Sequence, residues 1–208
     1  MSKELHVITS GKQPMEEVVS IAGNIHPYID YLHIREKEYS ASQLVEMIEE
    51  LIRIGIPRSK LIVNDRVDVA VAINVAGVQL GYRSISTHLV KKKFPTLYVG
   101  ASIHSVEEAL AREKDGADYL IYGHIFPSAS KPGLAPRGIK QLEQLVQSVQ
   151  TPVIALGGIQ FENVIEVLSA DVAGVAVMSY IWEAKDPIFQ VKKLVEKIKE
   201  YDHKVHMR

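Results

Sequence analysis

Cysteine is absent from this sequence of 208 residues, and tryptophan occurs once. Without a thiol, disulfides, thiolate metal sites and thiol catalysis are excluded. Residues 1–11 lack the apolar segment of a signal peptide, and no apolar run is long enough to cross a bilayer. These absences predict a protein of the cytoplasm.

Charge of either sign is not in excess, because the formal net charge is -1. The balance gives no electrostatic reason to expect nucleic acid or an anionic membrane as a partner. Neither nucleic acid nor a membrane is therefore expected as a partner, and a small-molecule partner enters only with the family resemblance described below. A homo-oligomer is compatible with the sequence, which does not specify the oligomeric state.

Short β-rich segments alternate with amphipathic helical segments along the whole chain. The predicted strands span 5–9, 28–34, 60–64, 77–80, 97–104, 119–126, 152–156 and 174–178. The predicted helices span 14–25, 40–54, 66–73, 87–93, 105–114, 138–149, 161–168 and 186–199. Alternation predicts a parallel sheet with crossover helices, and eight repeats predict closure into a single (β/α)₈ TIM barrel. Residues 1–208 form one domain in this interpretation, with 201–208 as a polar, frayed tail.

The sixth predicted strand contains the leading catalytic candidate, His124. This strand is apolar on both faces, and His124 comes near its carboxyl end, where active sites of such barrels lie. An imidazole can take up and release a proton near neutral pH. The alternative is a core histidine with both ring nitrogens hydrogen-bonded. His104 precedes a helix start and is expected to brace a loop instead.

Other polar residues follow the ends of the predicted strands. Arg35 and Lys37 lie on one face of the second strand by the period of two, which suggests an anion site. The alternative is a solvated charge cluster. Asp65, after the third strand, could bind a cation or cap the next helix. Gly157-Gly158 and Ser179 follow strands seven and eight, the usual place for a phosphate in these barrels.

Taken together and in order, these motifs resemble the thiamin phosphate synthase superfamily over nearly the whole chain. The matching stretches are His33-Ile34-Arg35-Glu36-Lys37, Asn64-Asp65-Arg66, Gly100-Ala101-Ser102-Ile103-His104-Ser105, Gly116-Ala117-Asp118-Tyr119, Gly123 to Lys131, Gly157-Gly158-Ile159 and Val177-Met178-Ser179. The family has a (β/α)₈ barrel, and its synthases join a hydroxymethylpyrimidine pyrophosphate to a thiazole phosphate with Mg²⁺.

The resemblance implies two groups of substrate-binding residues. The synthase's pyrophosphate side would include Arg35, Lys37, Asn64, Ser102 and Lys131. The thiazole phosphate would lie among Ser128, Ser130, Gly158, Met178 and Ser179.

Two departures from the synthase pattern point to the TenI branch of the family, the thiazole tautomerases. A synthase typically has Gly-Gln-Glu-Asp after strand four, and its Asp helps to hold Mg²⁺. This chain has Gly81-Tyr82-Arg83-Ser84 there, which leaves Asp65 as a poor site for a hard cation. A synthase also usually has Gly-Pro where this chain has Gly123-His124, and the TenI branch carries a histidine there.

The leading hypothesis is therefore an isomerase of thiamin biosynthesis that needs no cofactor and no metal. The resemblance implies that it aromatises a thiazole carboxylate phosphate by moving a proton from ring carbon C2 to the exocyclic carbon. The alternatives are a thiamin phosphate synthase, which is a transferase, and a non-catalytic regulatory barrel. A regulator of transcription is not indicated, because the chain has no basic stripe and no helix-turn-helix signal outside the predicted barrel helices.

Overall fold

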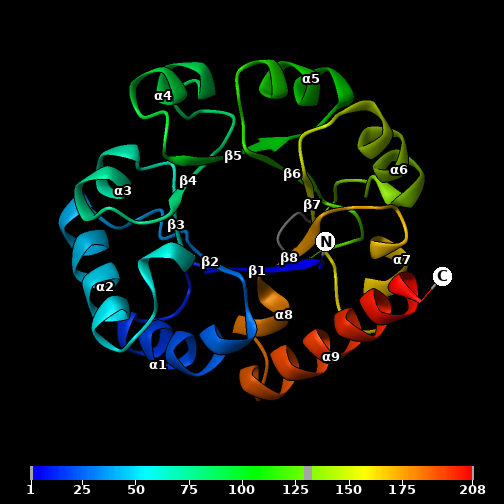
Figure 1. Cartoon of the computed structure of the whole chain (residues 1–208). Coiled ribbons are helices and arrows are strands. Elements are labelled where there is room, and N and C mark those ends of the chain that lie inside the picture. Colours follow the sequence, from blue (N-terminus) through cyan, green and yellow to red (C-terminus); the bar gives the residue numbers. More distant parts are fainter. Residues whose placement is uncertain (1, 129–132, 208) are drawn as a thin grey trace.

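The fold is a closed parallel barrel surrounded by a ring of helices, seen along its axis in Figure 1. The structure is a computed structural model that describes residues 2–128 and 133–207. Each strand pairs with the next in the chain, and β1 closes the ring by pairing in parallel with β8, from Glu4 with Gly174 to Val7 with Val177. The predicted (β/α)₈ barrel is thus confirmed.

The elements keep the predicted order. The strands are β1 (Glu4–Ile8), β2 (Tyr31–Ile34), β3 (Leu61–Asn64), β4 (Gly77–Leu80), β5 (Tyr98–Ile103), β6 (Tyr119–Gly123), β7 (Val153–Leu156) and β8 (Gly174–Val177). The α-helices are α1 (Met15–Ile25), α2 (Ala41–Arg53), α3 (Val67–Ile73), α4 (Thr87–Lys93), α5 (Val106–Lys114), α6 (Gly138–Ser148), α7 (Val164–Leu168), α8 (Ser179–Trp182) and α9 (Pro187–His206). Two 3₁₀ turns, His26–Tyr28 and Arg58–Lys60, precede β2 and β3.

The helix α2 shows how the sequence specifies these elements. Ser40 and Gln43 form a reciprocal capping box, in which the Ser40 hydroxyl accepts from the Gln43 N–H. The buried face of the helix has the three-and-four spacing of an amphipathic helix. Its buried residues are Leu44, Met47, Ile48 and Leu51. The sequence predicted this face, and the barrel wall covers it.

Two boundaries differ from the prediction in ways that matter for function. The strand β6 ends at Gly123, so His124 lies in the loop after the strand. The helix α9 continues to His206, and Tyr201 within it donates its hydroxyl to the Leu168 carbonyl (3.1 Å). The polar composition of this segment had predicted a frayed tail, whereas docking on α7 extends the helix. None of the helices in the described ranges is long and apolar enough to cross a membrane.

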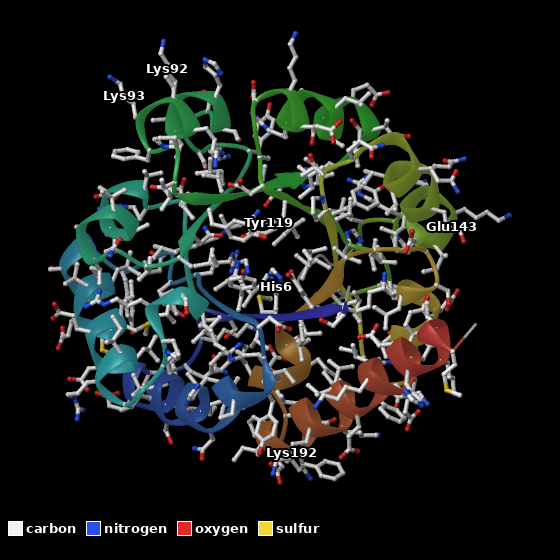
Figure 2. The ribbon with its side chains drawn as sticks, in the orientation of Figure 1. His6, Lys92, Lys93, Tyr119, Glu143 and Lys192 are labelled. Carbon is white, nitrogen blue, oxygen red and sulfur yellow. The ribbon has the colours of Figure 1, made fainter. Side chains whose placement is uncertain are left out.

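The interior of the barrel contains a buried polar chain. Figure 2 shows His6 and Tyr119 pointing into the ring of strands. Nε2 of His6 lies 3.0 Å from Oε2 of Glu4, and Nδ1 of His6 lies 2.9 Å from Nε2 of His33. The side chains of both histidines are inaccessible, at 0% and 1% exposure. Adding a proton to this buried pair would place a cation in the core, which is unfavourable.

Acidification is therefore expected to destabilise the fold through His33. Burial, together with the nearby His6 imidazole, lowers the pKa of His33 well below its usual 6.5. Below this pH the ring takes up a proton in the unfolded chain but stays neutral in the folded one. The stability associated with the neutral His33 ring is fully present above pH 6.5. As the pH falls below this value, the free energy of unfolding decreases by up to about 1.4 kcal/mol per pH unit.

Urea unfolding of the wild type, His33→Gln and His88→Gln at a series of pH values between about 7 and 5 measures this effect. His88 lies on the exposed side of α4 and serves as the matched control. The wild type and His88→Gln should lose stability with falling pH more steeply than His33→Gln. Equal slopes of the free energy of unfolding against pH for the three proteins would show that His33 does not cause the loss of stability.

Candidate active site at the carboxyl end of the barrel

A cavity of about 630 Å³ opens at the carboxyl ends of the strands. Its apolar lining comes largely from the neighbouring strand ends β6, β7, β8 and β1 and includes Ile8, Ile121, Leu156, Ala176 and Met178. The size and the apolar lining suit a small organic ligand. Among the residues predicted for the site, those that line the cavity are Arg35, Ser102, His124, Ser128, Gly158, Met178 and Ser179.

His124 lies in the wall of this cavity with its side chain largely buried, at 7% exposure. Its Nε2 is 3.3 Å from the backbone carbonyl oxygen of Leu134. A carbonyl oxygen only accepts hydrogen bonds, so Nε2 carries the proton and Nδ1 carries the lone pair of the neutral ring. Among the described residues Nδ1 has no hydrogen-bond partner. The imidazole is thus neither a doubly bonded core histidine nor a freely rotating one.

The turn after β7 makes room for His124. A Cβ atom on Gly157 would lie 2.4 Å from the Cβ of His124, a separation that two carbon atoms cannot adopt. Beyond the strand, the Ile125 N–H donates to the Leu156 carbonyl (3.0 Å), which keeps the β6 loop beside β7. Glycine at position 157 therefore has a steric reason in addition to its positive φ of 103°.

The neighbouring Gly158 shapes the place predicted for a phosphate. Its φ is 67°, and a Cβ there would lie 2.6 Å from the Pro127 carbonyl oxygen. The Asn163 side chain braces the turn by donating to the Gly158 carbonyl (2.9 Å). Ser179 begins α8 on the adjacent strand end, where the first N–H groups of a helix lack intrahelical partners. Gly158, Asn163 and Ser179 all line the cavity.

The wall of the cavity also contains the guanidinium of Arg35 and the hydroxyl of Ser102. Arg35 follows β2, and Ser102 lies on β5. The Ser102 hydroxyl accepts from Nε2 of Gln79 (3.0 Å), so the buried amide fixes its position. This part of the cavity offers an anionic group the positive charge of Arg35 and the hydroxyl O–H of Ser102 as a hydrogen-bond donor.

Lys37 does not join Arg35 in the cavity. The period of two that predicted a shared face ends with the strand at Ile34, and Lys37 is exposed. Glu36 is buried instead, at 6% exposure, close to the Thr9 hydroxyl and the Gly11 backbone. Burial raises the pKa of Glu36, and the nearby Thr9 hydroxyl, Arg35 and Gly11 backbone oppose this shift. The predicted cation pair is thus reduced to a single arginine at the cavity wall.

Two other predicted residues that the structure describes, Asn64 and Asp65, do not line the cavity. Asn64 is the last residue of β3, pairs in register with Gln79 and is not part of the lining. Ser130 and Lys131 lie outside the described residues. Asp65 is exposed and does not cap α3, whose N-cap is Arg66 without a side-chain bond.

Three cavity-related residues were missed or undervalued. His104 lines the cavity, and its Nδ1 is 3.4 Å from the Glu108 carboxylate, so it both braces a loop and faces the site. Asn163 precedes an apolar helical run, a recognisable N-cap signal. Arg137 contacts the end of β6, and no local sequence pattern predicts such a contact.

Comparisons with known proteins agree on the family. The sequence model of the TMP-TENI family, described as thiamine monophosphate synthase, matches residues 5–181. A thiamine-phosphate synthase of Pyrococcus abyssi is 38% identical over 198 residues, which cover 95% of this chain and 93% of the relative. A thiamine-phosphate synthase of Methanococcus vannielii is 36% identical over 199 residues, covering 95% and 96%.

A solved structure supports the same assignment. The thiamine phosphate pyrophosphorylase from Pyrococcus furiosus superposes with a TM-score of 0.81 at 33% sequence identity, over 95% of this chain and 96% of that one. The names of these relatives favour the synthase, which the sequence analysis placed second, over the tautomerase. On sequence and fold together, the chain belongs to the thiamine monophosphate synthase (TMP-TENI) family of enzymes.

Proposed function

We propose that this chain is the thiazole tautomerase of its family, an isomerase rather than a group-transfer enzyme. The observation that carries the proposal is the position and hydrogen bonding of the His124 ring. Its ring lies in the cavity wall, with Nε2 engaged by the Leu134 carbonyl and with Nδ1 left unbonded by the described residues. A general base needs a fixed ring and an available lone pair.

The proposed substrate is a thiazole carboxylate phosphate with two anionic ends. Its phosphate would lie at Gly158 and Ser179, on the strand ends next to His124. Its ring would cover the apolar lining of the cavity. Its carboxylate would face Arg35, which stands beyond β1 from the phosphate. The separation of glycine-rich turn and arginine across one cavity supports a ligand that is anionic at both ends.

The proton transfer balances within the substrate and one imidazole. Nδ1 of His124 takes the proton from ring carbon C2, and the electron pair of that C–H bond moves into the conjugated system. The imidazolium that forms is stabilised by its Nε2–H bond to the Leu134 carbonyl. The same ring then returns the proton to the exocyclic carbon, which leaves an aromatic thiazole and a neutral histidine.

Mg²⁺, which the synthases use, finds a poor set of ligands here. The family's acidic position after β4 is occupied by Gly81-Tyr82-Arg83-Ser84, and Asp65 is exposed and outside the cavity lining. Within the described ranges, no three histidine or carboxylate side chains group as metal ligands. Because a hard cation needs several oxygen ligands, these residues do not fit Mg²⁺.

The synthase is the second candidate, since the relatives carry that name. Incubation with each substrate set separates the two. The carboxylated thiazole phosphate should be converted to its aromatic isomer without Mg²⁺. The pyrimidine pyrophosphate and thiazole phosphate with Mg²⁺ should give no thiamin phosphate at an ordinary enzymatic rate. Synthase turnover on the order of 1 s⁻¹ would reverse the assignment. Tight binding without turnover of either set would favour a regulatory barrel.

A further inference from the structure

Arg137 contacts successive residues at the end of β6, where His124 is held. Its Nε–H donates to the Gly123 carbonyl (3.0 Å), and its guanidinium carbon lies 5.4 Å from the centre of the Tyr122 ring. Its backbone N–H donates to the His124 carbonyl (3.0 Å). The residue therefore joins the start of α6 to the backbone that carries the proposed base.

The segment around Arg137 also carries the oxygen that sets the tautomer of His124. Leu134, which accepts from Nε2, is three residues before Arg137. The Gly138 N–H donates to the Ile125 carbonyl (3.0 Å) and extends the contact by one residue. A movement of this segment away from β6 would take the Leu134 carbonyl out of hydrogen-bond range of the ring.

We propose that Arg137 is a positioning residue, whose side chain clamps the 133–138 segment on β6 and so keeps His124 in the Nε2–H tautomer. The clamp depends on the side chain, because any residue could supply the backbone N–H. The guanidinium offers a planar donor to the Gly123 carbonyl and a cation to the Tyr122 face. The kinetic consequence rests on the proposed function, whereas the tautomer itself does not.

If Arg137 had a purely structural role, its loss would have different consequences. Loss of a surface clamp that only stabilises the fold would lower the unfolding temperature and leave the folded active site unchanged. Loss of the positioning role would change the His124 ring in the folded protein. Displacement of a catalytic group by about 1 Å can lower a rate by 10²-fold.

The test uses the full-length variants Arg137→Met and Arg137→Lys, with Arg112→Met as the matched control. Arg112 lies on α5, outside the cavity lining, and forms an ion pair with Asp115 (3.3 Å) that the control variant loses. ¹⁵N spectra of the histidine rings, taken near pH 8 on folded protein and assigned with His124→Gln, report which nitrogen of His124 is protonated. Steady-state assays on the thiazole carboxylate phosphate report kcat and KM separately.

In the wild type and Arg112→Met we expect the Nε2–H tautomer alone. In Arg137→Met we expect a mixture of tautomers, a kcat lower by about 10–10²-fold and a KM within about threefold of wild type. Arg137→Lys, which keeps the charge without the planar donor, should lie between the two. If Arg137→Met does not fold, an unchanged spectrum and rate in Arg137→Lys overturn the proposal.

An Nε2–H tautomer retained in folded Arg137→Met, or a kcat within threefold of wild type, would also overturn it. If the wild-type protein did not convert the thiazole carboxylate phosphate, the proposed function would be wrong. The ring spectra would still decide whether Arg137 sets the tautomer.

Discussion

The variant His124→Gln is expected to fold and bind the thiazole product as the wild type does, and to lower kcat by about 10²–10⁴-fold, the usual effect of removing one general acid–base group. Glutamine can still donate to the Leu134 carbonyl from its amide nitrogen, so the local bond is kept while the titratable lone pair is lost. The reduction should appear in kcat more than in KM, since the imidazole acts on the reacting carbon.

Two comparisons make this measurement specific. His124→Asn shortens the side chain and removes both the base and the full reach to Leu134, so it should be at least as slow as His124→Gln. His88→Gln changes a histidine on α4, away from the cavity lining, and should keep the wild-type rate. If His124→Gln turned over within about threefold of wild type, His124 would be a packing residue, and the proton would have to move through another group.

The second large effect is expected at the phosphate end, from Ser179→Asp. A carboxylate at the first residue of α8 would stand beside the substrate phosphate, and like charges about 4 Å apart repel by about 4 kcal/mol at an effective dielectric constant of 20. We expect the product dissociation constant to rise by about 10²-fold or more. Aspartate is tolerated at helix N-termini, so the fold itself should not suffer.

Ser179→Asn is the matched control, because asparagine has nearly the same shape as aspartate without the charge. Its affinity should stay within about tenfold of the wild type. Isothermal titration with the thiazole phosphate product at low and high salt measures both variants. Equal losses in the two variants, or no salt dependence for Ser179→Asp, would show that charge is not responsible and that the phosphate binds elsewhere.

The sequence predicted which residues lie at the cavity where that position depends on their place along the chain. His124, Gly158 and Ser179 follow strands six, seven and eight, and parallel strands of a closed barrel bring such residues to one face. Lys37 and Asn64 show the limit of this reasoning. Both follow or end a strand, yet neither lines the cavity, because backbone direction beyond a strand depends on the contacts that the loop makes.

The inward turn of Glu36 illustrates that limit physically. Alternation along β2 assigns the residue to the face opposite Arg35. In the fold its side chain is buried close to the Thr9 hydroxyl and the Gly11 backbone, beyond the neighbouring strand end. Partners about 25 residues away in the chain decide this orientation, and no local periodicity contains them.

By itself, the sequence determined the barrel, because hydrophobic periodicity and turn residues are local and were repeated along the chain. It also predicted that the histidine and the glycine turn follow strands six and seven, because residue type and strand order can be read from it. Only the tertiary structure decided which nitrogen of His124 is protonated. That choice depends on the Leu134 carbonyl and on the Arg137 clamp, which lie 10 and 13 residues further along the chain and meet the ring only after the loop folds back on β6.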